Sequence, residues 1–229
     1  MKAAFKKNGV AYLKNIERRP LKPEEIRLEI TACGICGTDI LENPAEAGEE
    51  LPFGHEIAGT IIEVGTAIQD LRVGLKVVLD SATPCGKCYQ CRNAKQELCA
   101  NIQSFYCIRS FGFAEEMIAP AISAIPCEDL SPDIAILQEP LGVAIDLVRL
   151  ADVEIGSNVL IMGQGSIGLM ALVLAKRAGA RKVFVSDFKE RTACVKKAHQ
   201  FGADAFIDPN ETLLEKYDLS KVQVRVRVV

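Results

Sequence analysis

The second half of the chain alternates short apolar segments with helical patterns, and this order restricts the fold more than any other feature of the sequence. The apolar segments are residues 158–162, 182–186 and 205–208. Helical patterns connect them, one ending near Lys176 with Gly179 as its expected stop, the other running from Glu190 to Gln200. Strands joined by helices in this way lie parallel, with the helices packed on the faces of the sheet. We therefore expect an α/β domain with a parallel sheet.

The first half of the chain, to about residue 130, has the pattern of a β-rich region. Candidate strands separated by glycine, proline and aspartate are residues 25–30, 57–64 and 76–79. Ser131-Pro132-Asp133 then combines a hydroxyl cap, a proline for the first helical position and an acid for the first turn. This helix should run toward Leu150 and be interrupted at Pro140, because an interior proline removes a hydrogen bond and clashes with the preceding turn.

A loop in the first half carries four cysteines with the spacing C-x2-C-x2-C-x7-C, at Cys85, Cys88, Cys91 and Cys99. Four thiolates in one short loop suit tetrahedral Zn²⁺ and leave no open position, so the predicted site is structural. The alternative is a chance cluster of buried cysteines. The polar residues between the four cysteines, among them Lys87 and Arg92, make the loop poorly suited to a core and favour zinc.

Residues 163–168 read G-x-G-x-x-G and follow the first apolar segment of the second half. Glycines there allow a tight turn and a close approach of the backbone to a pyrophosphate at a helix N-terminus. A glycine-rich turn is the alternative, but Asp187 ends the next predicted strand, where a carboxylate accepts hydrogen bonds from a ribose and repels a 2′-phosphate. The pattern favours NAD over NADP. Lys189 and Arg191 could soften that preference, although such residues are more often solvated helix charges. The candidate cofactor-binding residues are Gly163, Gly165, Ile167, Gly168 and Asp187.

A third group of motifs precedes these two. CGICGTD (residues 33–39) and GHE (residues 54–56) come first, followed by the four-cysteine loop, Glu139-Pro140 and the glycine fingerprint. This ordered set resembles the medium-chain zinc-dependent alcohol and polyol dehydrogenases, in particular their sorbitol and threonine dehydrogenase branches, over residues 1 to about 210. The resemblance implies a zinc-binding catalytic domain with a GroES-like β-barrel in residues 1–140. It also implies a partial Rossmann-type dinucleotide-binding domain, with an incomplete parallel sheet, in residues 141–229.

The resemblance also implies a second, catalytic zinc ion. Cys36 and His55 would be ligands, and Glu56 would be a third ligand or an immediate neighbour. Glu139 stands where alcohol dehydrogenases have a cysteine ligand and where the polyol and threonine branches have a glutamate. One thiolate, one imidazole and one carboxylate leave an exchangeable fourth position. Glu139 could instead be a helix residue facing solvent, Cys33 is better explained as a packed thiol, and His199 as a surface residue.

By the same resemblance, zinc would act as a Lewis acid on a substrate hydroxyl, and hydride would pass to the nicotinamide. Thr38 would hydrogen-bond the reacting oxygen, and Asp39 would orient His55. Leu41 occupies the position of a histidine proton relay found in many members, so the proton must leave by another route or leave more slowly. The implied substrate is a secondary alcohol, a polyol or a hydroxy amino acid.

The end of the chain departs from the family pattern. Residues 210–220 form a plausible helix, and residues 222–229 alternate valine with polar residues, which suits a strand with one wet face. The family expects a fully buried parallel strand there. We therefore expect a missing or altered C-terminal part, and the alternative function is a catalytically impaired remnant that binds zinc and perhaps nucleotide.

Charge and hydropathy narrow the partners. The net charge is −3 and no basic–aromatic strip is evident, which disfavours a zinc module for nucleic acid. Residues 1–7 lack the apolar run of a signal peptide, and the longest apolar stretches are too short to span a bilayer. We expect a cytoplasmic homo-oligomer that acts on a small molecule.

Overall fold

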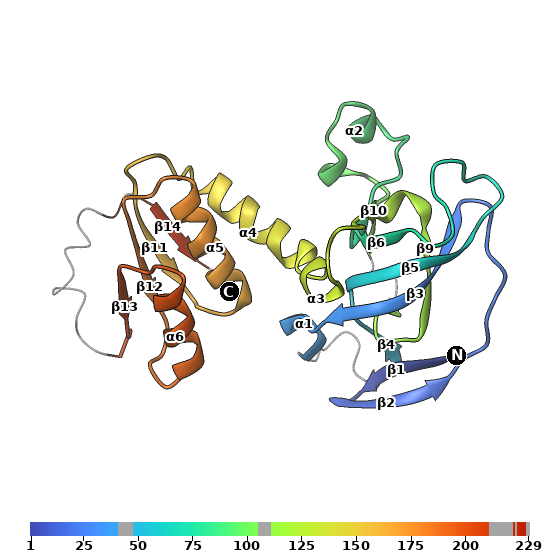
Figure 1. Cartoon of the computed structure of the whole chain (residues 1–229), viewed down its shortest axis with the longest axis horizontal. Helices are drawn as coiled ribbons and strands as arrows, with labels where there is room; N and C mark the ends of the chain where they lie inside the picture. Colours follow the sequence, from blue (N-terminus) through green and yellow to red (C-terminus); the bar gives the residue numbers. More distant parts are fainter. Residues whose placement is uncertain (41–47, 105–110, 211–221, 223, 228–229) are drawn as a thin grey trace. The chain divides into compact units, whose positions relative to one another are not determined.

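The computed structural model describes residues 1–40, 48–104, 111–210, 222 and 224–227. The chain divides into two compact units, Met1–Glu139 and Pro140–Val229 (Figure 1). Leu41 and nearly all of the candidate helix at 210–220 lie outside the described residues. In the part of the chain that the structure describes, no helix is long and apolar enough to cross a membrane.

Within the described residues, the larger sheet of unit 1 is antiparallel, with the strand order β10-β6-β5-β3-β9. Its strands are β3 (Glu25–Gly34), β5 (Glu56–Val64), β6 (Lys76–Leu79), β9 (Glu116–Pro120) and β10 (Ala124–Pro126). The strands expected at 25–30, 57–64 and 76–79 are confirmed as β3, β5 and β6. Alternate side chains of β3, Ile26 and Leu28, are fully buried and pack with Ile61 of β5 in the core of this unit.

Short elements complete unit 1. A second antiparallel sheet has the order β2-β1-β4, and β7 pairs with β8. The strands are β1 (Lys2–Lys7), β2 (Val10–Asn15), β4 (Leu51–Pro52), β7 (Ala82–Thr83) and β8 (Gln103–Ser104). The helical turns are α1 (Gly37–Ile40), α2 (Tyr89–Arg92), η2 (Gln96–Leu98), η3 (Ala121–Ser123) and α3 (Pro132–Ala135).

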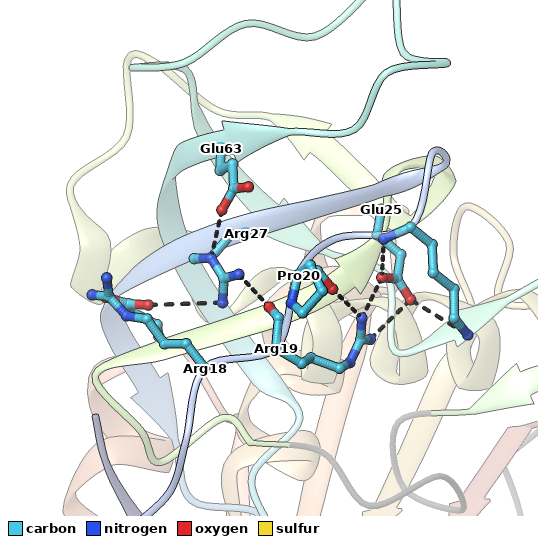
Figure 2. Close-up of polar contacts among 8 residues, drawn as sticks. Arg18, Arg19, Pro20, Glu25, Arg27 and Glu63 are labelled. Atoms are coloured by element: carbon cyan, nitrogen blue, oxygen red, sulfur yellow. Dashed lines mark hydrogen bonds and ion pairs between the residues drawn. The ribbon is translucent and has the colours of Figure 1, made fainter.

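Arg27 lies between Ile26 and Leu28, so its side chain leaves β3 on the opposite face, where an ion-pair network surrounds it (Figure 2). Only 7% of the guanidinium-bearing side chain is exposed. Its Nε donates to Glu63 at 2.8 Å, and its Nη2 donates to the carbonyl oxygen of Arg19 at 2.7 Å. Because a buried charge is costly without partners, these contacts explain how β3 carries an arginine between two core residues.

Unit 2 contains the expected parallel sheet. Its order is β13-β12-β11-β14 in the described chain, and every pairing is parallel. The elements are α4 (Gln138–Leu150), which begins two residues before this unit, β11 (Asn158–Met162), α5 (Ser166–Arg177), β12 (Lys182–Ser186), α6 (Thr192–Gln200), β13 (Ala205–Ile207) and β14 (Val224–Arg227). Helix α5 contacts β11 and β12, and α6 contacts α5 and β13.

The predicted stop of α5 is confirmed, since Gly179 follows the helix with φ +97°. Strand β14 shows that the alternating C-terminal segment pairs in parallel with β11.

The prediction for the helix at 131–150 was wrong in one respect. The break lies between α3 and α4, at residues 136–137, and not at Pro140. Pro140 falls in the first turn of α4, where a backbone N–H has no intrahelical acceptor, so the proline costs the helix nothing. Ser131 is the N-cap residue of α3, but its side chain makes no capping hydrogen bond.

Candidate metal centres and glycine fingerprint

The pairing of β3 with β5 positions the residues of the first candidate metal centre. Gly34, at the end of β3, lies opposite Glu56, the first residue of β5. The turn that follows β3 therefore brings Cys36 beside His55 and Glu56, and one ligand atom from each lies within 4.8 Å of the other two. A Cβ at Gly34 would lie 1.9 Å from a carboxylate oxygen of Glu56, so only glycine leaves room for this carboxylate.

Asp39, on α1, connects two members of this group. Its Oδ2 accepts a hydrogen bond from the backbone N–H of Cys36 at 2.9 Å, and its Oδ1 lies 3.7 Å from Nδ1 of His55. The side chains of Asp39 and His55 are 4% and 9% exposed. One buried carboxylate thus fixes the cysteine turn and faces the imidazole, which is the arrangement of a group that orients metal ligands.

Thr38, the residue before Asp39, has an unsatisfied hydroxyl. Its Oγ1 is buried, and no hydrogen-bond partner for it occurs in the described part of the chain. A buried hydroxyl without a partner is costly, so such a group is often completed by a ligand. The thiol, imidazole and carboxylate of Cys36, His55 and Glu56 are a donor set that suits zinc, and among the described residues no fourth side chain joins this group.

The two carboxylates expected near the metal lie in different environments. Burial raises the pKa of Glu56, and the negative charge of Glu139 raises it further. Glu139 accepts a hydrogen bond from Oγ of Ser81 at 3.0 Å, and its carboxylate is not part of the group formed by Cys36, His55 and Glu56. The charge of Glu139 therefore acts on this group, while its oxygen is held by Ser81.

Cys33 differs from Cys36 although both belong to the same motif. Burial raises the pKa of the Cys33 thiol to about 12, with a further contribution from the charges of Asp39 and Glu56. The thiol packs against the core of unit 1. Within the described residues Cys33 is also outside the group of ligand atoms formed by Cys36, His55 and Glu56, so its place in the core fits a packed thiol.

The four-cysteine loop forms the second candidate metal centre. The sulfur atoms of Cys85, Cys88, Cys91 and Cys99 all lie within 4.8 Å of one another. The N–H groups of Cys85 and Asn101 each donate to Sγ of Cys99 at 3.3 Å. Backbone N–H groups, first that of Cys91, lower the pKa of Cys88 to about 6, whereas burial raises the pKa of Cys91 to about 12. Four sulfur atoms with N–H donors aimed at them fit a closed, structural zinc site.

The glycine fingerprint joins β11 to α5. Gly163 follows β11 with φ +97°, and Gly165 is the N-cap residue of α5. A Cβ at Gly168 would lie 1.9 Å from the carbonyl oxygen of Gly163, so the turn can close onto the helix only with glycine there. The N-terminus of a twelve-residue helix therefore opens directly at the end of a parallel strand, the place where such folds hold phosphate groups.

Asp187 lies at the end of β12, beside this turn, and is buried. Its carboxylate accepts hydrogen bonds from the backbone N–H groups of Gln164 and Phe188 and from Nη1 of Arg191, each at 2.8 Å. Burial alone would raise the pKa of Asp187, but these N–H groups and the charge of Arg191 together lower it. The carboxylate is therefore ionised and fixed against the fingerprint.

Comparison with known proteins supports the interpretation of these residues as zinc and dinucleotide sites. The alcohol dehydrogenase GroES-like domain family matches residues 22–129. The L-threonine 3-dehydrogenase of Thermococcus kodakarensis is 37% identical over 196 residues, which are 82% of this chain and 55% of that relative. A zinc-binding dehydrogenase from Sinorhizobium meliloti, solved with bound NADP, is 31% identical with a TM-score of 0.79 and covers 91% of this chain and 62% of its own. Galactitol-1-phosphate dehydrogenase from Escherichia coli is 28% identical with a TM-score of 0.83, with shares of 93% and 62%.

Residues 22–129 belong to the alcohol dehydrogenase GroES-like domain family, and over most of its length the chain is similar to zinc-binding and polyol dehydrogenases. It spans a little over half the length of the L-threonine 3-dehydrogenase that it matches. The fold class expected from the resemblance, a β-rich GroES-like part followed by a Rossmann-type α/β part, is confirmed.

The structure also identifies residues that the sequence did not single out. Ser81 holds Glu139, and no motif marks it. Gln164 is fully buried, and its Nε2 donates to the carbonyl oxygen of Gly163 at 3.1 Å. Arg191, which was interpreted from the sequence either as a solvated helix charge or as a group that softens the cofactor preference, is 49% exposed and pairs with Asp187 at 2.8 Å.

Proposed function

We propose that this chain carries the zinc and dinucleotide sites of an oxidoreductase that transfers hydride from a secondary alcohol, polyol or hydroxy amino acid to NAD. The observation that carries the proposal is the group Cys36, His55 and Glu56, three metal-ligating side chains accompanied by the unpartnered hydroxyl of Thr38. A purely structural zinc site would need neither an open coordination position nor an unpartnered hydroxyl. The fingerprint and Asp187 supply a dinucleotide site in the same chain.

In this proposal each residue has a distinct task. Cys36, His55 and Glu56 hold a catalytic zinc ion, and the four cysteines of the loop at 85–99 hold a structural one. When bound, the catalytic zinc supplies Lewis acidity that lowers the pKa of a substrate hydroxyl. Oγ1 of Thr38 would accept a hydrogen bond from that hydroxyl and orient it. Glu139 acts through its charge and remains a candidate ligand if it leaves Ser81.

In this proposal unit 2 binds the dinucleotide. The N-terminus of α5 takes the pyrophosphate, with Gly163, Gly165, Ile167 and Gly168 shaping the turn, and Asp187 takes the adenosine ribose. We further propose that the protein works as a homo-oligomer in the cytoplasm. None of the eight cysteines that the structure describes forms a disulfide bond, which suits a reducing compartment.

Turnover and dinucleotide binding test this proposal when they are measured separately. Protein purified without chelator should bind NAD in a calorimetric titration. It should also reduce NAD with L-threonine, a sugar alcohol or a simple secondary alcohol. Removing zinc should abolish reduction, and adding zinc should restore it. Binding of NAD without zinc-dependent reduction of NAD by any of the three classes would contradict the proposed activity and favour a remnant that only binds.

Asp39→Asn is expected to weaken zinc binding at the Cys36 group by about 10- to 100-fold, because it removes the charge that faces His55. A chelator competition that follows the two zinc ions separately measures this change, with the ion of the four-cysteine loop as an internal reference. Asp133→Asn removes an exposed acid of α3 and should leave both affinities unchanged. Equal zinc affinity in the Asp39→Asn variant and the parent chain would show that Asp39 does not orient a ligand.

A further inference from the structure

The side chain of Gln164 is turned into the protein, although it lies in the middle of the glycine turn. It is fully buried, and its Nε2 lies 3.1 Å from the carbonyl oxygen of Gly163 and 3.5 Å from that of Ile161. Carbonyl oxygens only accept hydrogen bonds, so the amide must present its N–H groups to them and its oxygen to the other side. The two backbone carbonyl groups therefore decide the orientation of the amide.

The peptide group between Gly163 and Gln164 is held at both of its polar atoms. Its carbonyl oxygen accepts a hydrogen bond from the side chain of Gln164, and its N–H donates to Oδ2 of Asp187 at 2.8 Å. A Cβ at Gly168 would lie 1.9 Å from the same carbonyl oxygen, so the position of this oxygen limits how closely the first turn of α5 approaches β11. Gln164 thus fixes the peptide group against which α5 begins.

The other end of the amide is unsatisfied. Oε1 of Gln164 is buried and has no hydrogen-bond partner in the part of the chain that the structure describes. A buried acceptor without a partner costs stability, so an apolar side chain of similar size would serve the fold about as well. The contacts of Nε2 with the turn explain a glutamine here better than stability does, and unsatisfied buried groups of this kind call for a functional explanation.

We propose that Gln164 is a positioning residue for the dinucleotide, because it holds the carbonyl oxygen of Gly163 and so fixes the turn in the shape that receives a pyrophosphate before any ligand binds. The inference rests on the proposed dinucleotide site. It goes beyond the glycine pattern, in which position 164 is unrestricted. A turn that is ordered in advance loses less conformational entropy on binding, which strengthens the complex. No role in hydride transfer is assigned to Gln164.

Gln164→Met tests the inference, because methionine has about the same length as glutamine but no N–H group. Calorimetric titrations of the whole chain with NAD and with ADP, which share the adenosine and the pyrophosphate, should show both dissociation constants raised by about tenfold. The midpoint of thermal unfolding without nucleotide should change little, since the loss of the Nε2 contacts is offset by the removal of an unpaired acceptor. Gln200→Met makes the same chemical change at the exposed end of α6 and should leave all three values unchanged.

Hydrogen exchange of the parent chain tests the order of the turn without a variant. In the absence of nucleotide, the backbone N–H of Gln164 should exchange at least about a hundredfold more slowly than in an unstructured peptide, because its peptide group is already fixed. In Gln164→Met this N–H should exchange faster than in the parent chain. Fast exchange in the parent chain that slows only when NAD binds would show that the ligand orders the turn, and the inference would be wrong.

Two results of the titrations would also overturn the inference. One is equal dissociation constants for NAD and ADP in Gln164→Met and the parent chain. The other is a loss of affinity that is fully matched by a loss of folded protein, which is what a merely structural role predicts. If the parent chain binds neither NAD nor ADP, the proposed dinucleotide site itself fails, and this result is distinct from a parent chain and a variant that bind equally well.

Discussion

Cys36→Ser is expected to leave the chain with one zinc ion instead of two and to lower zinc-dependent hydride transfer by roughly a thousandfold or more. A serine hydroxyl is not ionised at neutral pH and replaces a thiolate poorly, so His55 and Glu56 remain as two ligands. Two ligands with an open side do not retain zinc against water. Elemental analysis of the purified variant, together with the rate of NAD reduction, measures both effects.

Cys33→Ala supplies the control for this variant. Cys33 lies three positions earlier in the same motif, but its pKa is raised to about 12 by burial and it packs in the core of unit 1. Its replacement should lower stability slightly and leave two zinc ions. Retention of both ions in Cys36→Ser would remove Cys36 from the metal site. Loss of one ion in both variants would indicate damage to the fold of the turn.

Cys91→Ala should release the zinc of the four-cysteine loop and unfold that loop locally. The loop contains only α2, with four residues, and the three-residue η2. Helices of this length are not stable alone, and the folding energy of small zinc modules comes largely from the metal. We expect trypsin to cut within residues 85–99 at least roughly a hundredfold faster than in the parent chain, since Lys87, Arg92 and Lys95 lie there.

The location of the cuts distinguishes local from global unfolding. Mass spectrometry of early digests should find them in the loop, while the sheet of β3, β5 and β9 remains protected. Cys194→Ala, a change on α6, should resemble the parent chain, and chelator treatment of the parent chain should reproduce the Cys91→Ala pattern. An equal rate of cleavage in Cys91→Ala and the parent chain would mean that the loop is held by its own packing and not by zinc.

The sequence predicted the parallel sheet because the pattern that indicates it depends on local physics. Alternation of apolar segments and helices in the second half requires a parallel sheet, and the described structure contains it. The sequence analysis placed the break at Pro140 instead of at residues 136–137. The cost of a proline depends on where its helix begins, and the sequence offered only one start signal, at residues 131–133.

The candidate sites also combine features that the sequence predicts with features that it does not. The spacing of four cysteines concentrates four sulfur atoms in one loop whatever the rest of the fold does. The environment of Glu139 depends instead on Ser81, which is far away in sequence and belongs to no motif. The pairing of Arg191 with Asp187 depends on a turn between β12 and α6 that brings two residues together before the helix begins. Such contacts are decided by tertiary geometry and side-chain orientation, which residue patterns do not contain.

The zinc content of the parent chain tests the central claim most directly, because the two candidate metal centres are formed by different residues and have different proposed ligands. Protein purified without chelator, supplied with zinc and freed of excess metal, should contain two zinc ions per chain. Of the two, the ion held by Cys36, His55 and Glu56 should leave first under chelator, since one thiolate and an open position hold it less firmly than four thiolates hold the other. A reproducible value of one ion or fewer would contradict the account.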